Sequence, residues 1–361
     1  MINKHITGNI TIGSLLHINE SDLFTNVNNI LLVTSPTVSK YLKVEKTKEI
    51  LAKNYNLTFF NEIKPNAPII DLDNLVAKTP KPDLIIGIGG GSVIDSCKAL
   101  SVAWQGATII DLFYKKESLS NKKIKTIAVP TTAGTGAELS FGSILYDTKD
   151  HIKSGLRGSQ LQPNLAFIDI DLYIDAPNKL IAEVGFDCLT HAIETYVSTA
   201  STPMVKYQSV AAIQVVFGQL RSAFLKDKNA LEKVAIAAAL MGINLAQSST
   251  CLPHRIQYAL GPKTNTSHAQ GLIMLYKGWL TEIKDTEVFN ELAHALGLTT
   301  TDFVENIIRL KQDLNIDYSL ADYGVNSSDI LEIASNVTGN MDNDPCYKSK
   351  ETIISILQNS L

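Results

Sequence analysis

The amino-acid sequence predicts an α/β domain with a mostly parallel sheet over residues 1–178, followed by an all-helical domain over residues 179–361. Two patterns carry this prediction. In the first half, short apolar runs rich in β-branched residues alternate with segments of helical pattern. From Lys179 onward, apolar residues recur every three or four positions instead. A chain of 361 residues that is 45% hydrophobic can bury the cores of two ordinary domains.

Four strands are expected in the first half. Each is a short apolar run of the kind that lies buried in a parallel sheet, and they cover residues 29–34, 83–88, 125–129 and 165–169. The segments of helical pattern between them are expected to pack on the faces of that sheet.

The domain boundary is expected at residues 176–178, where a proline disfavours helix at the residue before it and the next asparagine can cap a helix. Helical periodicity then covers residues 179–196, 205–225 and 231–245. No low-complexity linker separates the two halves, so the domains are expected to pack closely and form a cleft.

The composition excludes several kinds of partner. With 32 basic and 36 acidic residues, the net charge of −4 favours neither nucleic acid nor an anionic membrane, so a small molecule is the expected partner. The N-terminal segment lacks the apolar stretch of a secretory signal, and no apolar run reaches the ~18 residues of a membrane span. The four cysteines show no CxxC spacing, which indicates reduced, mostly buried thiols. A cytoplasmic protein is expected.

A run of three glycines follows the second predicted strand. In IGIGGGSVIDSCKAL, Gly89 to Gly91 and Ser92 lie at a strand-to-helix turn, where backbone N–H groups and a helix N-terminus can hold a phosphate. The spacing is not GxGxxG, so a tight connection without a ligand is the alternative. Asp95 and Lys98, further along, are either part of this site or a solvated ion pair.

A second turn of this kind follows the third predicted strand. VPTTAGTGAELS offers hydroxyl groups at Thr131, Thr132 and Thr135, which can donate hydrogen bonds to a pyrophosphate or a carboxamide. Because both turns follow successive strands of one sheet, they are expected at the same edge, where open α/β sheets bind ligands.

Candidate metal ligands lie in the helical half. In GFDCLTHAIETYVS, Asp187 and His191 are four residues apart and project from one face of a helix, which suits two ligands of one ion. Surface or capping residues are the alternative. Glu194 is expected to be solvated or to support a ligand from behind.

Two further histidines lie in CLPHRIQYALGPKTNTSHAQG. His254 is expected near the start of a helix that Gly261-Pro262 terminates, and His268 is expected to open the next helix. Periodicity cannot bring these two histidines together across that break.

Four of these motifs together resemble the group III, or iron-containing, alcohol dehydrogenase family: GGGSVIDSCKAL, PTTAGTGAELS, FDCLTHAIETYVS and PHRIQYALGPKTNTSH. The match runs in order from about Asn29 to the C-terminal NDPCYKSKETIISIL. The resemblance implies the dehydroquinate synthase-like fold, with a Rossmann-like dinucleotide-binding domain, a helical metal-binding domain and an active site between them. It also implies a homodimer.

The resemblance assigns roles to particular residues. It makes Asp187, His191, His254 and His268 the ligands of one catalytic metal. The pyrophosphate turn and the loop that reaches the cofactor fall on Gly89, Gly90, Gly91, Ser92, Asp95, Thr131, Thr132 and Thr135. Lys153 approximately matches a basic residue near the nicotinamide.

The chain departs from the family pattern at four positions. NAD-preferring members often carry an aspartate after the second strand, which repels a 2′-phosphate; Ser35 stands here, so NAD and NADP both stay open. The family's HxxxHPLG reads HRIQYALG, so Tyr258 replaces a second histidine, and a phenol that titrates near ~10 is a poor proton relay. Arg255 and Gln257 replace small residues and are candidates for contact with a hydroxylated, acidic substrate. A solvated arginine is the alternative for Arg255.

The resulting hypothesis is an NAD(P)-dependent alcohol dehydrogenase. An Fe²⁺ or Zn²⁺ ion, between which the ligand set does not choose, would polarise the hydroxyl of the substrate while its carbon passes a hydride to the nicotinamide. The sequence also resembles a branch that oxidises C8 of 3-deoxy-manno-octulosonate in lipopolysaccharide sugar biosynthesis, making an aldehyde for an aminotransferase. A small diol or aldehyde oxidoreductase is the alternative.

Three other classes are weaker. A metal-dependent lyase of the dehydroquinate synthase type shares the fold and would leave no net reduced cofactor. A metal-dependent hydrolase would have no use for two phosphate-binding turns. A non-enzymatic binding protein would leave the four metal ligands unexplained.

Overall fold

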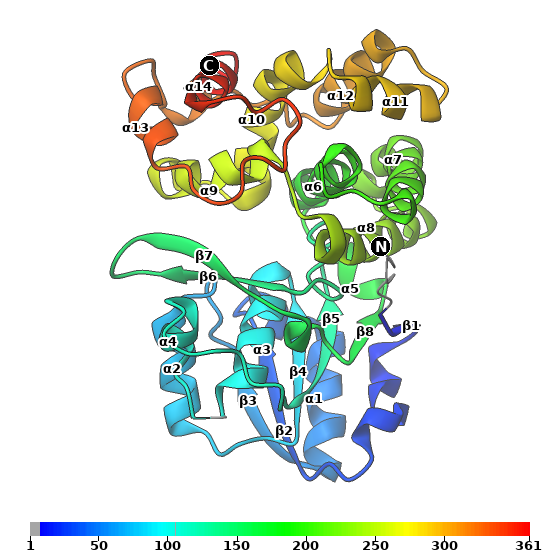
Figure 1. Ribbon diagram of the computed structural model, residues 1–361. Helices are drawn as coiled ribbons and strands as arrows, with labels where there is room; N and C mark the ends of the chain where they lie inside the picture. Colours follow the sequence, from blue (N-terminus) through cyan, green and yellow to red (C-terminus); the bar gives the residue numbers. More distant parts are fainter. Residues whose placement is uncertain (1–7, 105) are drawn as a thin grey trace. The chain divides into compact units, whose positions relative to one another are not determined.

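The computed structural model describes residues 8–104 and 106–361, which form two compact units (Figure 1). The first unit ends at Ala176 and the second begins at Pro177, two residues before the predicted boundary. Pro177 occupies the N-cap position of the first long helix of the second unit and makes no side-chain cap hydrogen bond. The asparagine that was expected to cap this helix, Asn178, is instead its first residue.

The first unit is built on a sheet of six parallel strands in the order β1-β8-β5-β4-β2-β3. The strands are β1 (Ile10–Ile12), β2 (Asn29–Thr34), β3 (Asn56–Phe60), β4 (Leu84–Gly89), β5 (Lys125–Pro130) and β8 (Leu165–Ile168). All four predicted strands are present, each with ends within one residue of the prediction. The sequence analysis missed β1 and β3, because both are edge strands that lack a continuous buried run.

A separate antiparallel hairpin, also not predicted, consists of β6 (Gly142–Asp147) and β7 (Ile152–Arg157). Its strands are only partly buried and alternate in exposure, which leaves a weaker apolar signal than a central parallel strand.

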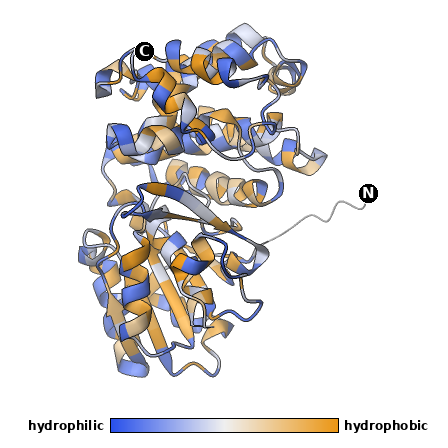
Figure 2. Cartoon of the chain, turned by 60° about the vertical axis from the view of Figure 1, so that its left-hand side comes forward, coloured by the Kyte–Doolittle hydropathy of each residue, from blue (hydrophilic) through white to orange (hydrophobic). Residues whose placement is uncertain are grey.

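Hydrophobic strands and covering helices make the core of this unit. The central strands are apolar along most of their length (Figure 2), and β4 is buried at every position. Leu31, Val33 and Ile85 pack with apolar side chains of α2, α3 and α4. The helical elements are α1 (Leu42–Asn54), α2 (Ile69–Lys78), α3 (Gly91–Ala103), α4 (Ile109–Phe113) and α5 (Asp171–Ile174), with 3-10 helices η1 (Leu15–Glu20), η2 (Asp22–Phe24), η3 (Val38–Lys40) and η4 (Ser159–Leu161).

In the second unit, all the secondary structure of the described residues is helical, as predicted. Its elements are α6 (Asn178–Val197), α7 (Pro203–Phe224), α8 (Lys228–Ser248), α9 (Leu252–Thr264), α10 (His268–Ile283), α11 (Glu287–Ala295), α12 (Thr300–Asp313), the 3-10 helix η5 (Ala321–Tyr323), α13 (Ile330–Ser335) and α14 (Lys350–Gln358). Among the described residues, α8 alone is long and apolar enough to cross a membrane by length and composition. Most of its apolar window is buried and it packs on α6 and α7, as a core helix does.

One predicted helix end is wrong. α9 does not stop at Gly261-Pro262 but continues to Thr264 and ends at Asn265, whose backbone is left-handed with φ of 51°. Pro262 removes a single N–H donor and its fixed φ is helical, so the last turn tolerates it, whereas a left-handed residue stops a helix. α10 opens at His268, as predicted, behind a capping box between Ser267 and Gln270.

Candidate metal and cofactor sites

The four predicted metal ligands come together within the helical unit. Asp187 and His191 lie one turn apart on α6, His254 lies in the first turn of α9, and His268 is the first residue of α10. One ligand atom from each lies within 4.8 Å of the other three. Three of the four side chains are buried and His268 is partly buried. The fold thus brings His254 and His268 together, which helical periodicity alone could not predict.

The cluster fits a single divalent ion. Ligand atoms around a tetrahedral ion with bonds of about 2.1 Å lie about 3.4 Å from one another. Asp187 Oδ1 lies 3.5 Å from His191 Nε2 and 3.7 Å from His254 Nε2, which is near that spacing and too long for strong hydrogen bonds. Three imidazoles and one carboxylate are accepted by both Zn²⁺ and Fe²⁺. The donor set therefore does not choose between these ions.

Glu194 supports His254 from behind. Nδ1 of His254 lies 2.9 Å from both carboxylate oxygens, and the Cys251 N–H donates to Glu194 Oε2 at 2.8 Å. Such a carboxylate fixes the ring and its tautomer, so that Nε2 is the metal-binding nitrogen. Glu194 is fully buried, so the solvated alternative is wrong. Burial raises its pKa to about 8, against the opposing effect of the Cys251 N–H.

The start of α9 is anchored by a second buried carboxylate. Asp344 accepts hydrogen bonds from the Leu252 N–H at 2.9 Å and from Trp279 Nε1 at 2.8 Å. A negative charge at a helix N-terminus is favourable, and the contact holds the turn that carries His254. No sequence pattern pointed to Asp344, because it lies far from α9 along the chain.

Three of the four residues that depart from the family pattern, Arg255, Gln257 and Tyr258, have definite contacts. Arg255 donates from Nη2 to Ser249 Oγ at 2.9 Å and to the Thr250 carbonyl at 3.4 Å. It is buried, so the solvated alternative is wrong, and these contacts are those of a structural arginine. The Tyr258 ring stacks on the His268 ring, with centroids 5.9 Å apart and planes at 17°. Gln257 contacts the same histidine, with its Oε1 2.6 Å from Nδ1 of His268.

In the α/β unit, the two glycine-rich turns lie side by side at the carboxyl edge of β4 and β5. The Thr131 N–H donates to the Gly89 carbonyl at 3.1 Å. A Cβ atom on Gly90 would lie 3.4 Å from Thr132 Oγ1, and one on Gly91 would lie 3.1 Å from Thr135 Cγ2. Gly90 immediately precedes α3, so its neighbours present backbone N–H groups at a helix N-terminus. This is the placement that the sequence predicted.

Asp95 and Lys98 are not a solvated pair. Lys98 is fully buried and its Nζ contacts Asp95 Oδ1 at 3.1 Å and Ser140 Oγ at 2.9 Å. The Asp95 carboxylate also accepts from the Ile144 N–H at 3.0 Å. Burial raises the pKa of Asp95 and lowers that of Lys98. Asp95 therefore ties α3 to the hairpin, and its predicted place in the cofactor site stays a prediction.

Three further predicted cofactor residues remain to be placed: Ser92, Lys153 and Ser35. Lys153 on β7 donates from Nζ to Asn66 Oδ1 at 3.0 Å, and the Asn66 N–H donates to Ser92 Oγ at 3.1 Å. Lys153 is therefore linked to the glycine-rich turn through one intervening residue, Asn66. Ser35 follows β2, and its Oγ accepts from the Val38 N–H at 3.3 Å.

Glu138 is a buried acid that the sequence analysis did not single out. It belongs to the second glycine-rich loop, is 2% exposed, and its Oε2 has no hydrogen-bond partner among the described residues. Burial raises its pKa to about 7, an effect that the charge of Lys98 partly offsets.

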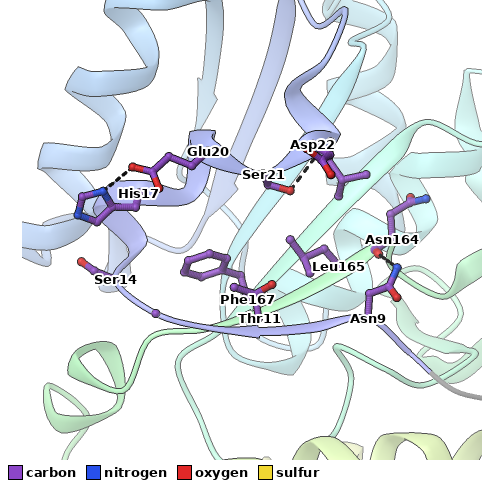
Figure 3. A pocket seen from close by; sticks show the side chains of 12 residues that line it. Asn9, Thr11, Ser14, His17, Glu20, Ser21, Asp22, Asn164, Leu165 and Phe167 are labelled. Atoms are coloured by element: carbon purple, nitrogen blue, oxygen red, sulfur yellow. Dashed lines mark hydrogen bonds and ion pairs between the residues drawn. The ribbon is translucent and has the colours of Figure 1, made fainter.

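A pocket of about 540 Å³ in the α/β unit contains none of the predicted site residues. It lies between β1, the start of β8 and the 3-10 helices η1 and η2 (Figure 3). Phe167 and Leu165 line it, together with polar side chains that include the His17–Glu20 pair, whose Nδ1 and Oε1 are 2.8 Å apart. It holds no grouping of side chains that matches the chemistry described above.

A cluster of four possible metal ligands in a helical unit and two glycine-rich turns on a parallel sheet are features expected of a metal-dependent dehydrogenase. Comparison with protein families agrees: the iron-containing alcohol dehydrogenase model matches residues 10–170, and the C-terminal model of the Fe-containing alcohol dehydrogenase family matches residues 181–361. The chain belongs to the iron-containing alcohol dehydrogenase family. It is an oxidoreductase that uses NAD or NADP and a divalent metal ion. The predicted family, fold class and enzyme class are confirmed.

Relatives cover nearly the whole chain. It is 27% identical over 348 residues to the sulfoacetaldehyde reductase of Bilophila wadsworthia (strain 3_1_6), which covers 91% of this chain and 90% of the relative. It is 29% identical over 321 residues to the lactaldehyde reductase of Escherichia coli (strain K12), 84% of each. The structure of an alcohol dehydrogenase from Oenococcus oeni matches with a TM-score of 0.89 and 27% identity over 98% of each chain.

Proposed function

We propose that this protein oxidises the primary C8 hydroxyl of 3-deoxy-manno-octulosonate to an aldehyde, or catalyses the reverse reduction, in lipopolysaccharide sugar biosynthesis. The observation that supports a substrate outside the common range of the family is Tyr258. It replaces the second histidine of the family motif, and its ring stacks on the ligand His268. The wall of the metal site is therefore built differently in this chain.

The residues have separate tasks in this reaction. When bound, the metal ion acts as a Lewis acid towards the oxygen of the substrate, and the nicotinamide exchanges a hydride with its carbon. Asp187, His191, His254 and His268 would hold the ion. The backbone N–H groups at the turn before α3 would hold the pyrophosphate of the cofactor.

The alternative is an oxidoreductase for small diols or aldehydes. Two relatives are named for the reduction of small aldehydes, lactaldehyde and sulfoacetaldehyde. The contacts of Arg255 Nη2 with Ser249 and Thr250 also give no support to an acidic substrate. This alternative therefore competes directly with the sugar acid.

A substrate panel tests the proposal. Protein loaded with Fe²⁺ or Zn²⁺ is mixed with NAD or NADP and with 3-deoxy-manno-octulosonate, glycerol, propanediols or short alkanols, and the near-ultraviolet absorbance of reduced cofactor is followed. We expect metal-dependent reduced cofactor with the sugar acid, and an aldehyde trapped from the product. Rapid oxidation of small diols with no response to the sugar acid would establish the alternative. Cofactor binding without net reduction by any substrate would point to a synthase.

The remaining proposals concern location and partners, and they rest on the composition and on the family resemblance. We propose a cytoplasmic homodimer that acts on free small molecules and binds neither nucleic acid nor membrane. Light scattering of the purified protein, with and without cofactor, measures the mass and checks the dimer.

A further inference from the structure

Gln257 is a buried amide that contacts a metal ligand. It lies on α9, three residues after His254, and is fully buried. Its Oε1 lies 2.6 Å from Nδ1 of His268. Its Nε2 has no hydrogen-bond partner among the described residues. Burying an amide with one end unsatisfied costs stability, so the contact with His268 calls for a reason.

Two glycines leave the space that this side chain occupies. A Cβ atom on Gly271 of α10 would lie 2.7 Å from Gln257 Cγ, which real Cβ atoms do not tolerate. A Cβ atom on Gly261 would lie 3.1 Å from Gln257 Nε2. The backbones of α9 and α10 therefore enclose the amide and fix its position.

The direction of the amide decides whether His268 can bind a metal. An imidazole that offers the lone pair of Nε2 carries its proton on Nδ1, so the group at Nδ1 has to accept a hydrogen bond. Gln257 Oε1 is such an acceptor. If the amide turned its NH₂ towards Nδ1, that nitrogen would have to accept, and the proton would move to Nε2 and block the metal.

The partner of His254 is a carboxyl group and not an amide. Glu194 can only accept when ionised, and a carboxylate makes an imidazole a stronger ligand than a neutral amide does. The two histidines are thus supported unequally, one by a carboxylate and one by an amide.

We propose that Gln257 is the positioning residue of His268. Its amide oxygen selects the tautomer that presents Nε2 to the metal, and its lack of charge makes His268 the more weakly held of the two supported histidines. This inference rests on the proposed metal site. It gives Gln257 a role in metal binding in place of the substrate contact predicted from sequence.

The rate of metal loss tests the inference without measuring turnover. The protein is loaded with Co²⁺, whose visible spectrum reports the ligand geometry, and transfer of the ion to an excess of chelator is followed. Gln257→Leu removes the acceptor, Gln257→Glu makes it a permanent acceptor, and Gly271→Ala displaces it without altering any ligand. Gln247→Leu on α8 is the matched control, since within the described residues the side chain of Gln247 bonds to the Ile243 carbonyl of its own helix.

We expect Gln257→Leu to lose Co²⁺ about 10- to 100-fold faster than the wild type, with an altered spectrum. Gly271→Ala should behave in the same way, and it replaces the leucine variant if that one does not fold. Gln257→Glu should keep the spectrum of the wild type and lose the ion more slowly. Gln247→Leu should match the wild type.

Two results would overturn the inference, and they differ in meaning. If the wild type binds one Co²⁺ tightly and both Gln257→Leu and Gly271→Ala release it at the wild-type rate with an unchanged spectrum, the role of Gln257 is wrong and the metal site stands. If the wild type itself holds no stoichiometric Co²⁺, Fe²⁺ or Zn²⁺, the metal site is wrong and the role of Gln257 falls with it.

Discussion

In the α/β unit the turn expected to hold the pyrophosphate is contiguous in sequence and offers its backbone, whereas in the helical unit the metal ligands come from three helices and act through side chains. The turn at Gly89 to Gly91 forms because a strand ends and a helix begins there. The cluster of Asp187, His254 and His268 forms only when α6, α9 and α10 pack. Local sequence therefore specifies the first site, and tertiary structure specifies the second.

The two units also treat a buried glutamate differently. Glu194 in the helical unit has both oxygens in contact with His254 and accepts from the Cys251 N–H. Glu138 in the α/β unit has an oxygen without a partner among the described residues. Burial raises the pKa of each, to about 8 and to about 7. Glu194 positions the metal ligand His254, whereas the burial of Glu138 lowers the stability of the fold.

Removing a metal ligand should have the largest effect on the enzyme. Asp187→Asn keeps the volume of the side chain but not its charge, and we expect it to lower metal content and to reduce turnover by at least about 1,000-fold, because several kcal/mol of Lewis-acid stabilisation are lost. Elemental analysis and steady-state kinetics measure the two effects. Nucleotide binding should stay within about twofold of the wild type, because the turns lie in the other unit.

The control for this variant is His294→Ala, on the exposed side of α11. It should retain both metal and activity. An Asp187→Asn protein that keeps one metal ion per chain and full turnover would falsify the assignment of the cluster.

Glu138→Gln should have the next largest effect, on stability. The folded protein holds the proton of Glu138 up to about pH 7, whereas an unfolded chain releases it near 4.5. Stability from this proton is present below 4.5 and is lost as the pH rises through 7, by up to roughly 3 kcal/mol. Thermal unfolding of the two proteins at several pH values should show the glutamine variant gaining on the wild type as the pH rises over that window.

The exposed Glu49→Gln on α1 serves as the control and should follow the wild type at every pH. A constant difference between Glu138→Gln and the wild type from about pH 5 to about pH 8 would mean that Glu138 is ionised in the folded protein throughout.

Sequence predicted the parts of the fold that local patterns specify. The buried strands β2, β4, β5 and β8 and the long helices α6, α7 and α8 give strong apolar periodicity. The edge strands β1 and β3 and the hairpin of β6 and β7 do not, because half or more of their side chains meet solvent. Pro262 misled the prediction of a helix end, because α9 carries this proline inside its last turn and ends instead at the left-handed Asn265.

The metal site was predictable only in part from the residues themselves. Periodicity placed Asp187 and His191 on one helical face, and the resemblance to a family supplied His254 and His268. The supporting contacts were out of reach of either argument. Asp344 holds α9 from a distance of many residues, and the pairing of Gln257 with His268 depends on how α9 and α10 pack.

A pair of glycine substitutions in the α/β unit separates the packing of the turn from its expected role in cofactor binding. A Cβ atom on Gly89 would lie 2.5 Å from Val93 Cγ2, whereas one on Gly90 would meet Thr132 only at the ordinary distance of 3.4 Å from Oγ1. Gly89→Ala should therefore destabilise the protein by about 1–3 kcal/mol. Gly90→Ala should change stability little and weaken NAD(P) binding. Unfolding curves and nucleotide titrations separate the two effects.

Metal content is the internal control for both glycine variants, since neither touches the helical unit. Equal stability of the Gly89→Ala and Gly90→Ala proteins would show that the turn relaxes, and would contradict the close packing of Gly89 on Val93.

The smallest effect is expected at Ser35, the position that the family resemblance places beside the adenosine ribose. Ser35 follows β2 and its Oγ accepts from the Val38 N–H, a bond that an aspartate can also accept, so Ser35→Asp should fold normally. A carboxylate at this place repels the 2′-phosphate of NADP, and a loss of about 1.4 kcal/mol corresponds to about tenfold weaker binding. Binding of NAD should change little.

Titrations of both cofactors at low and high salt measure the change, and the difference should shrink as salt screens the repulsion. Thr37→Asp, at an exposed position of the same turn, is the matched control. Equal losses of NAD and NADP in the Ser35 variant would mean that this residue does not face the adenosine ribose, so that preference between the cofactors is decided elsewhere in the α/β unit.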